Sequence, residues 1–163
     1  MRSTVAYWRL LVTALVAVVC DQITKWWVVQ NIPEGTYPIP HSEIISGLLY
    51  LVHIHNDGAA WGMLSGYGMW LAWLGILTLI GFYFLRHSFG LQNTKTQWFF
   101  GFLIGGIAGN IIDRFVYGHV IDFIDVHLPG YRWPAFNFAD AFITIGVALY
   151  LIQQLKSSSN EKK

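Results

Sequence analysis

The sequence contains little charge and a single cysteine. Only 12% of its 163 residues are Asp, Glu, Lys or Arg, about half the share of a typical soluble domain. One cysteine, Cys20, excludes an internal disulfide and a cysteine-based zinc site. A net charge of +1 offers no basic surface for nucleic acid. These scarcities exclude an ordinary soluble domain, a disulfide-stapled scaffold and a nucleic-acid-binding protein.

Apolar and aromatic residues are abundant instead. Hydrophobic residues make up 55% of the chain, with 8 Trp, 8 Tyr and 11 Phe. Aromatic rings gather where a membrane meets water. We therefore predict an integral membrane protein with one compact domain, residues 1–163.

The first apolar stretch has two interpretations. Arg2 and Arg9, followed by "LVAVVC", resemble a lipoprotein signal sequence that ends at its acceptor, Cys20. However, Val19 is not the small residue such a site needs, and the apolar stretch resumes after Asp21 as "ITKWWVV". We interpret the segment as a retained membrane span.

Four apolar stretches approach the length of about 20 residues that crosses a bilayer. They cover residues 10–29, 67–85, 97–113 and 136–155, and the polar tail 157–163 is predicted to be disordered and cytoplasmic. Seven of the ten Lys and Arg residues lie before the first stretch, between the second and third, or after the fourth. Because basic residues concentrate on cytoplasmic segments, the sequence predicts an all-α bundle of four transmembrane helices with both termini in the cytoplasm.

The long first connection carries a strand pattern. In "LLYLVHIHN", residues 48–56, Leu49, Leu51, His53 and His55 alternate with residues of the opposite face. The preceding "TYPIPHSEII", residues 36–45, is a candidate partner strand. We expect a small extracytoplasmic β-sheet between the first and second helices.

The acidic residues gather on the other side of the membrane from most of the basic residues. Eight of the nine lie at or beyond the predicted outer helix ends: Asp21, Glu34, Glu43, Asp57, Asp113, Asp122, Asp125 and Asp140. Ionisable groups at membrane depth are expensive and mark functional sites. This uneven distribution of the acidic residues predicts a functional site near the outer face of the membrane.

Several polar residues have both a structural and a functional interpretation. Asp21 and Lys25 are four apart, as in a helical ion pair, and either neutralise each other or orient neighbouring loops. Asn56 begins the turn "NDGAAWG" and either forms that turn or offers its amide to an extended peptide. In "GFLIGGIAGNIIDR", glycines at every fourth position favour close helix packing, while Asn110 and Arg114 share one helix face.

Two aspartates carry the strongest functional signal. Asn137 and Asp140 have the spacing of a helix N-cap and capping box, so Asp140 has a structural interpretation. Asp122 lies among apolar neighbours in "GHVIDFIDVHLPGY", where Asp125 is interpreted as a solvated loop acid. If the last two helices are antiparallel neighbours, Asp122 and Asp140 converge. Two desolvated carboxylates then share one proton and perform acid–base catalysis of the aspartic-protease kind.

At these residues the chain resembles the bacterial lipoprotein signal peptidases, the signal peptidase II family. The resemblance runs through almost the whole chain: "DQITK" (21–25), "HNDGAAWG" (55–62), "GGIAGNIIDR" (105–114), "GHVIDFID" (118–125) and "FNFAD" (136–140). Mild departures occur at Trp61 and Ile107, and neither touches an acid.

The resemblance implies an aspartic endopeptidase of the bacterial cytoplasmic membrane, with its active site near the outer, periplasmic face. Such an enzyme needs no metal or other cofactor and cuts diacylglyceryl-modified prolipoproteins before the lipid-bearing cysteine. Membrane lipids, globomycin-type cyclic peptide inhibitors and a monomeric state are expected with it. Asp122 and Asp140 match the catalytic pair, and the supporting or substrate-binding positions match Asp21, Lys25, Asn56, Gly106, Gly109, Asn110, Arg114 and Asn137.

Two alternatives from other classes remain at this point. One is a metal-dependent membrane enzyme that uses His53, His55, His119 or His127, although the chain lacks a His-Glu-x-x-His motif. The other is a small transporter or channel with an acidic proton relay, which predicts carboxylates near the middle of the membrane.

Overall fold

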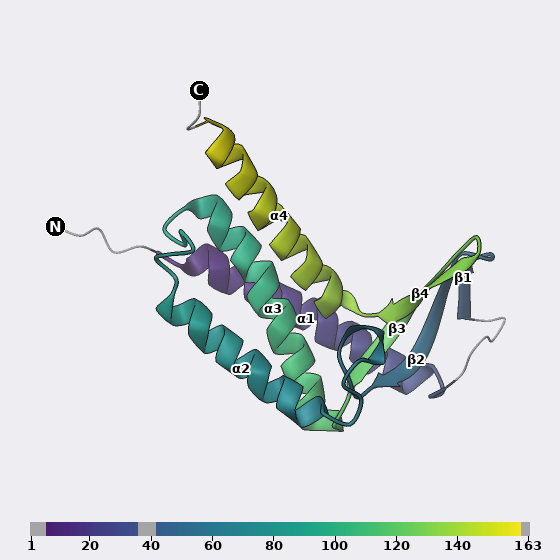
Figure 1. Ribbon diagram of the computed structural model, residues 1–163. Helices are drawn as coiled ribbons and strands as arrows, with labels where there is room; N and C mark the ends of the chain where they lie inside the picture. Colours follow the sequence, from purple (N-terminus) through teal and green to yellow (C-terminus); the bar gives the residue numbers. More distant parts are fainter. Residues whose placement is uncertain (1–5, 36–41, 161–163) are drawn as a thin grey trace.

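The computed structural model describes residues 6–35 and 42–160. A bundle of helices lies beside a small sheet at one end (Figure 1). The helices are α1 (Trp8–Asn31), α2 (Gly68–Phe84), α3 (Thr94–Tyr117) and α4 (Phe138–Asn160). α1 begins, and α4 ends, at the end of the bundle away from the sheet.

α3 is the central helix and packs against α1, α2 and α4. It begins after Asn93, whose side chain accepts a hydrogen bond from the N–H of Lys95, and it ends at Gly118 in the left-handed conformation (φ 82°). Glycines bring its neighbours close. A Cβ at Gly101 would lie 2.5 Å from Cβ of Thr13 on α1, so the predicted close packing of this helix is confirmed.

Each of the four predicted spans overlaps one helix, although the bounds differ by a few residues. Three of the helices, Trp8–Asn31, Thr94–Tyr117 and Phe138–Ser158, are long and apolar enough to cross a membrane, whereas Gly68–Phe84 is a shorter apolar helix. Large apolar side chains are exposed on the outer helix faces, as expected where lipid is the solvent. α4 continues to Asn160, so the disorder predicted from residue 157 is wrong as far as residue 160, and residues 161–163 lie outside the described part.

The sheet has four antiparallel strands in chain order: β1 (Glu43–Ile45), β2 (Leu49–Asn56), β3 (Val120–Leu128) and β4 (Tyr131–Phe136). The sheet predicted between the first two helices is therefore only half of the observed one, because β3 and β4 come from the connection between α3 and α4. The sequence predicts a loop for that connection and places Phe136 in the last span, and both expectations are wrong, because residues 120–128 and 131–136 are strands. The chain alone therefore did not reveal that β2 pairs with β3.

β2 departs from the predicted alternation. Val52 and His53 are adjacent, yet both are buried, because the register of β2 against β3 shifts between Leu51 and Ile54. Of the candidate partner strand, the structure describes residues 42–45, which contain β1, and residues 36–41 lie outside it.

The sheet is attached to the bundle through α1. Val28 and Ile32 near the end of α1 form an apolar cluster with Ile121 and Phe123 of β3. Because β3 also leads from α3 to β4 and then α4, this cluster holds the β3–β4 segment against the helix ends. Asp122 lies between the two β3 residues of the cluster.

Candidate active site

Asp140 lies in the first turn of α4 and is held by its own cap. The side-chain oxygen of Asn137 accepts a hydrogen bond from the Asp140 N–H at 3.0 Å, and Oδ2 of Asp140 accepts from the Asn137 N–H at 3.4 Å. This reciprocal pair is the predicted capping box. The second bond is long, as expected when Asp replaces the longer Glu.

The capping residue also contacts the second aspartate. Nδ2 of Asn137 donates to Oδ1 of Asp122 at 2.8 Å. Asp122 and Asp140, which are 18 positions apart in the chain, therefore meet on one fully buried asparagine. The fold thus provides the convergence that a shared site for the two carboxylates requires.

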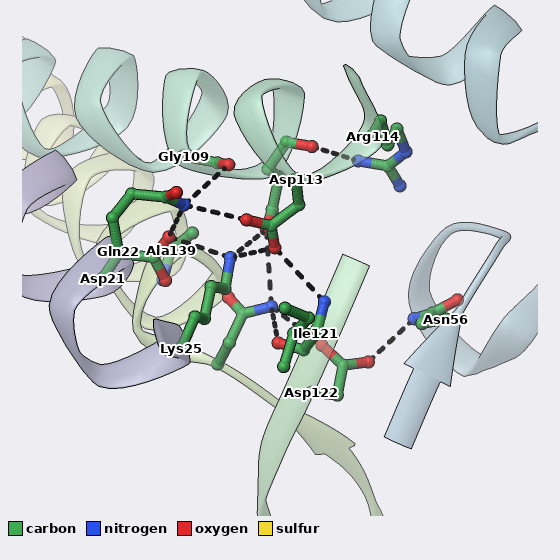
Figure 2. Close-up of polar contacts among 12 residues, drawn as sticks. Asp21, Gln22, Lys25, Asn56, Gly109, Asp113, Arg114, Ile121, Asp122 and Ala139 are labelled. Atoms are coloured by element: carbon green, nitrogen blue, oxygen red, sulfur yellow. Dashed lines mark hydrogen bonds and ion pairs between the residues drawn. The ribbon is translucent and has the colours of Figure 1, made fainter. Parts of the chain in front are cut away.

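Amides orient the remaining carboxylate oxygens. Nδ2 of Asn56, at the end of β2, donates to Oδ2 of Asp122 at 2.9 Å (Figure 2). Nδ2 of Asn110 on α3 donates to Oδ1 of Asp140 at 2.8 Å. Each carboxylate therefore accepts hydrogen bonds at both oxygens, and the side chains of three asparagines from different elements hold the pair.

The electrostatic environment of Asp122 is unusual. Its side chain is only 2% exposed. Burial, together with the nearby charge of Asp140, raises the pKa of Asp122 from 3.8 to about 7, against the opposing effect of the hydrogen bonds from Asn56 and Asn137. Asp122 therefore retains a proton at pH values where an ordinary aspartate has lost it.

Arg114 connects the site to the loop after β2. Its NH2 donates to the carbonyl oxygen of Gly58 at 2.7 Å, and its NH1 donates to the carbonyl oxygen of Asn110 at 3.1 Å. The Arg114 side chain therefore holds the 56–60 loop against α3, whereas Asn110 contacts a carboxylate directly. The buried Nε of Arg114 has no hydrogen-bond partner within residues 6–35 and 42–160.

Asp21 and Lys25 form the predicted ion pair, with 2.8 Å between Nζ and Oδ2. Both are buried, and Nζ of Lys25 also lies 2.7 Å from Oδ2 of Asp113. The sequence interpretation missed this role of Asp113 and also that of Gln22, which donates to Asp113 at 2.8 Å. The available signal was Asp113 itself, an acid with no cation three or four positions away along its own helix.

The two glycines of the third-span motif permit close approach at the site. A Cβ at Gly109 would lie 2.5 Å from Oδ2 of Asp21, and a Cβ at Gly106 would overlap the carbonyl oxygen of Ala139, next to Asp140. Any side chain at these positions would displace α1 or α4.

A cleft of about 770 Å³ opens beside Asp140. Its polar end contains Asn56, Asn110, Arg114 and Asp140, and its walls are mostly apolar, with residues from β3, β4 and α4. A smaller cavity of about 290 Å³ reaches Asp122 and shares Asn56, Pro134 and Ala135 with the first. The carboxylates therefore lie where a polar site meets an apolar channel, as suits a ligand that is part peptide and part hydrocarbon.

The structure also corrects the interpretation of Asp125. It lies in β3 with no exposed surface, not in a solvated loop. Its Oδ1 and Oδ2 accept from Nε and NH2 of Arg132 at 3.0 and 2.9 Å, and His127 contacts Oδ2 at 3.1 Å. The pair ties β3 to β4, which forms a wall of the cleft.

The histidines serve the fold around β2. Nδ1 of His53 contacts the carbonyl oxygen of Ile32 at 2.9 Å, and His55 contacts Glu34 and stacks on His119. Across the part of the chain that the structure describes, no three His, Cys, Asp or Glu side chains are grouped to hold a metal ion. The histidines therefore do not assemble the site that the metal-enzyme alternative required.

Comparison with known proteins shows which family the chain belongs to. A sequence model of the signal peptidase (SPase) II family matches residues 13–156. The chain belongs to the signal peptidase II family.

Two curated relatives show how far the similarity extends. A lipoprotein signal peptidase of a Cyanothece species is 42% identical over 144 residues, which cover 86% of this chain and 79% of the relative. That of Bacillus subtilis is 39% identical over 153 residues, covering 92% and 95%. The family match over residues 13–156 contains all five motifs and covers at least part of every helix.

Solved structures share the fold. Two structures described as bacterial membrane enzymes superimpose with TM-scores of 0.84 and 0.77, each at 35% identity. The first covers 94% of this chain and 92% of the other, and the second covers 90% and 92%. The signal peptidase II chain is therefore a membrane enzyme with this arrangement of helices and sheet.

Proposed function

We propose that this chain removes signal peptides from diacylglyceryl-modified bacterial prolipoproteins, with Asp122 and Asp140 as the catalytic pair. The cut would lie just before the lipidated cysteine. The observation that carries the proposal is the meeting of both carboxylates on Asn137, with Asp140 lining the apolar cleft and Asp122 lining the smaller cavity beside it. The family and the names of its relatives support the same activity, and no observation favours a transporter.

The two aspartates lie in different environments, which give them different roles in proton transfer. Asp122, with a pKa raised to about 7, is the partner that holds the proton at the start of the reaction. Asp140 lies in the cleft wall, where Asn110 and the N–H of Asn137 donate to it. Because Asp122 already carries a proton, Asp140, which lines the cleft, is the carboxylate that accepts a proton from water and acts as the general base.

The reaction then follows with a balanced transfer of protons. Asp140 takes one proton from a water molecule, whose oxygen attacks the scissile carbonyl carbon, while Asp122 donates its proton to the carbonyl oxygen. Collapse of the tetrahedral intermediate breaks the C–N bond, and Asp140 passes its proton to the departing amine. The proton on the former carbonyl oxygen returns to Asp122, which restores the pair.

The cleft suits the two halves of such a substrate. Its polar end would receive the peptide around the scissile bond, held by the loop that Arg114 fixes through Gly58. Its apolar walls would receive acyl chains and the apolar signal helix. A globomycin-type cyclic peptide is expected to compete for the same polar end.

The proposed topology places this cleft at the outer face of the cytoplasmic membrane. Three segments lie at the end of the bundle away from the sheet (Figure 1): the beginning of α1, the connection between α2 and α3, and the end of α4. Basic residues Arg9, Arg86, Lys95 and Lys156 belong to these segments, which supports a cytoplasmic location for that end. One chain supplies both aspartates and all three asparagines around them, which supports a monomeric enzyme.

The test is cleavage of a lipidated prolipoprotein by purified protein in detergent. Asp122→Asn and Asp140→Asn should each lower kcat by at least about 1000-fold, since proton transfer and water activation are both lost. Glu43→Gln, an exposed carboxylate change on β1, is the matched control and should cleave normally. Substantial cleavage by either aspartate variant would refute the catalytic pair.

A further inference from the structure

A buried charge cluster lies behind the two aspartates, outside the cleft. Lys25 forms ion pairs with Asp21 at 2.8 Å and with Asp113 at 2.7 Å, and no more than 1% of any of these side chains is exposed. Nε2 of Gln22 bridges the two carboxylates, at 2.8 Å from Oδ1 of Asp113 and 3.2 Å from Oδ2 of Asp21 (Figure 2). The cluster joins α1 to α3, and none of its members lines the cleft.

Each of the two acids also holds one backbone N–H group. Oδ2 of Asp113 accepts from the N–H of Ile121 at 3.2 Å, and Oδ1 of Asp21 accepts from the N–H of Ala139 at 2.8 Å. Ile121 directly precedes Asp122, and Ala139 directly precedes Asp140. The N–H of Ala139 belongs to the first turn of α4, where no carbonyl of that helix can accept it.

A third contact connects Lys25 to Asp140 through Asn110. Nζ of Lys25 donates to Oδ1 of Asn110 at 3.1 Å, and Nδ2 of Asn110 donates to Asp140 at 2.8 Å. A lysine ammonium can only donate, so it requires the amide oxygen of Asn110 to face α1. The amide nitrogen must then face Asp140.

We propose that Asp113 and Asp21, joined through Lys25, are positioning residues that set the separation of the two catalytic carboxylates. Asp113 holds the segment of Asp122 and Asp21 holds the segment of Asp140, so that Lys25 couples the two through one buried contact. This inference rests on the proposed function, in which Asp122 and Asp140 are the reacting pair. The cluster itself touches neither substrate nor water in the reaction.

Asp113 gives the sharper test because two neutral substitutions separate charge from hydrogen bonding. Asp113→Asn removes the charge and keeps an oxygen that accepts the Ile121 N–H. Asp113→Leu keeps the branching at Cγ and the number of side-chain heavy atoms, removes the same charge and has no acceptor. Both leave Lys25 with one anionic partner, Asp21, and with the amide oxygen of Asn110, so neither strands an unpaired buried cation.

In detergent, with a lipidated prolipoprotein, Asp113→Asn should retain kcat within about fivefold of the wild type. Asp113→Leu should lose about 30- to 100-fold in kcat with KM within threefold, as expected for misplaced catalytic groups. The fall in kcat on the alkaline side should also move to lower pH in Asp113→Leu than in Asp113→Asn. A wider separation weakens the effect of Asp140 on Asp122, while Lys25 and Arg114, the cations facing the pair, remain in both variants.

Several outcomes overturn the positioning role. They are equal kcat losses in the two variants, identical alkaline limbs, or wild-type cleavage by Asp113→Leu. A simple loss of folded protein lowers the rate without moving the pH limb, so it does not imitate the expected result. If Asp113→Leu is not monodisperse, Asp21→Asn and Asp21→Leu make the same comparison at the N–H of Ala139. The proposed function has its own test, and it is refuted if Asp122→Asn or Asp140→Asn cleaves the lipidated prolipoprotein.

Discussion

Replacing Asp122 with asparagine should make the protein inactive and, at neutral to alkaline pH, more stable. The pKa of Asp122 is raised from 3.8 to about 7, chiefly by burial. A raised pKa means that the fold prefers the protonated acid. Stability linked to this group is thus fully present below about pH 4 and is lost as the pH rises toward 7.

The size of the effect follows from the shift. Each pKa unit corresponds to about 1.4 kcal/mol, so ionisation of Asp122 costs the fold roughly 4 kcal/mol above pH 7. Asparagine is neutral at every pH and avoids this cost. It also turns one acceptor oxygen into an NH2 group that faces a donor, Asn56 or Asn137, which costs about 1–3 kcal/mol. The net gain should be about 1–3 kcal/mol at pH 8 and close to zero near pH 5.

Thermal unfolding in detergent at pH 5, 6, 7 and 8 measures this gain. For a chain of this size, each kcal/mol corresponds to about 2–4 °C in Tm, so Asp122→Asn should melt roughly 2–12 °C above the wild type at pH 8. Glu43→Gln is the control with the opposite environment. Hydrogen bonds from the Gly47 N–H and the Tyr50 hydroxyl lower the pKa of Glu43, so its substitution should not stabilise the protein between pH 5 and 8.

The pH trend decides the outcome. A difference in Tm between Asp122→Asn and the wild type that stays constant from pH 5 to 8 would refute the raised pKa. It would also remove the reason for assigning the proton to Asp122. A variant that is less stable than the wild type at pH 8 would show that the lost hydrogen bond outweighs the avoided charge.

Further outcomes test other parts of the site. The kcat of the wild-type enzyme should decline above about pH 7, as Asp122 loses its proton, and a flat rate from pH 6 to 9 would contradict this. Asn56→Ala should lower kcat about 10- to 100-fold and move that decline to higher pH, because the Asn56 hydrogen bond lowers the pKa of Asp122; an unmoved limb would speak against it. Gly106→Ala should lower both Tm and activity because its Cβ would overlap the Ala139 carbonyl oxygen, whereas Gly81→Ala, with no atom within 4 Å of the added Cβ, should behave like the wild type in both assays.

Local features of the site were readable from the chain. Asn137 and Asp140 of the capping box are three positions apart, and Asp21 and Lys25 of the ion pair are one helical turn apart. Such contacts depend only on helix geometry, which is fixed by the spacing of the residues. The small-residue pattern of α3 likewise indicated close packing before any partner helix was known.

Contacts between distant segments were not readable in the same way. The third ligand of the Lys25 cluster, Asp113, lies 88 positions away from it, and Asp122 pairs with Asn56 over 66 positions. The interpretation of Asp125 as a loop acid failed for this reason. An isolated "FIDVH" does not reveal that β2 and β4 flank it and that Arg132 returns to meet it.

The sequence by itself determined a membrane protein with four apolar helices, a capped fourth helix and five motifs that resemble one family, because burial in lipid and helical spacing act through composition and short range. Only the tertiary structure decided that Asp122 and Asp140 share Asn137, that half of the sheet comes from the last connection, and that one buried lysine links both aspartate segments. Those features depend on packing α1, α3 and α4 together. The contacts that stabilise them form only in the assembled bundle, between segments that are distant in the sequence.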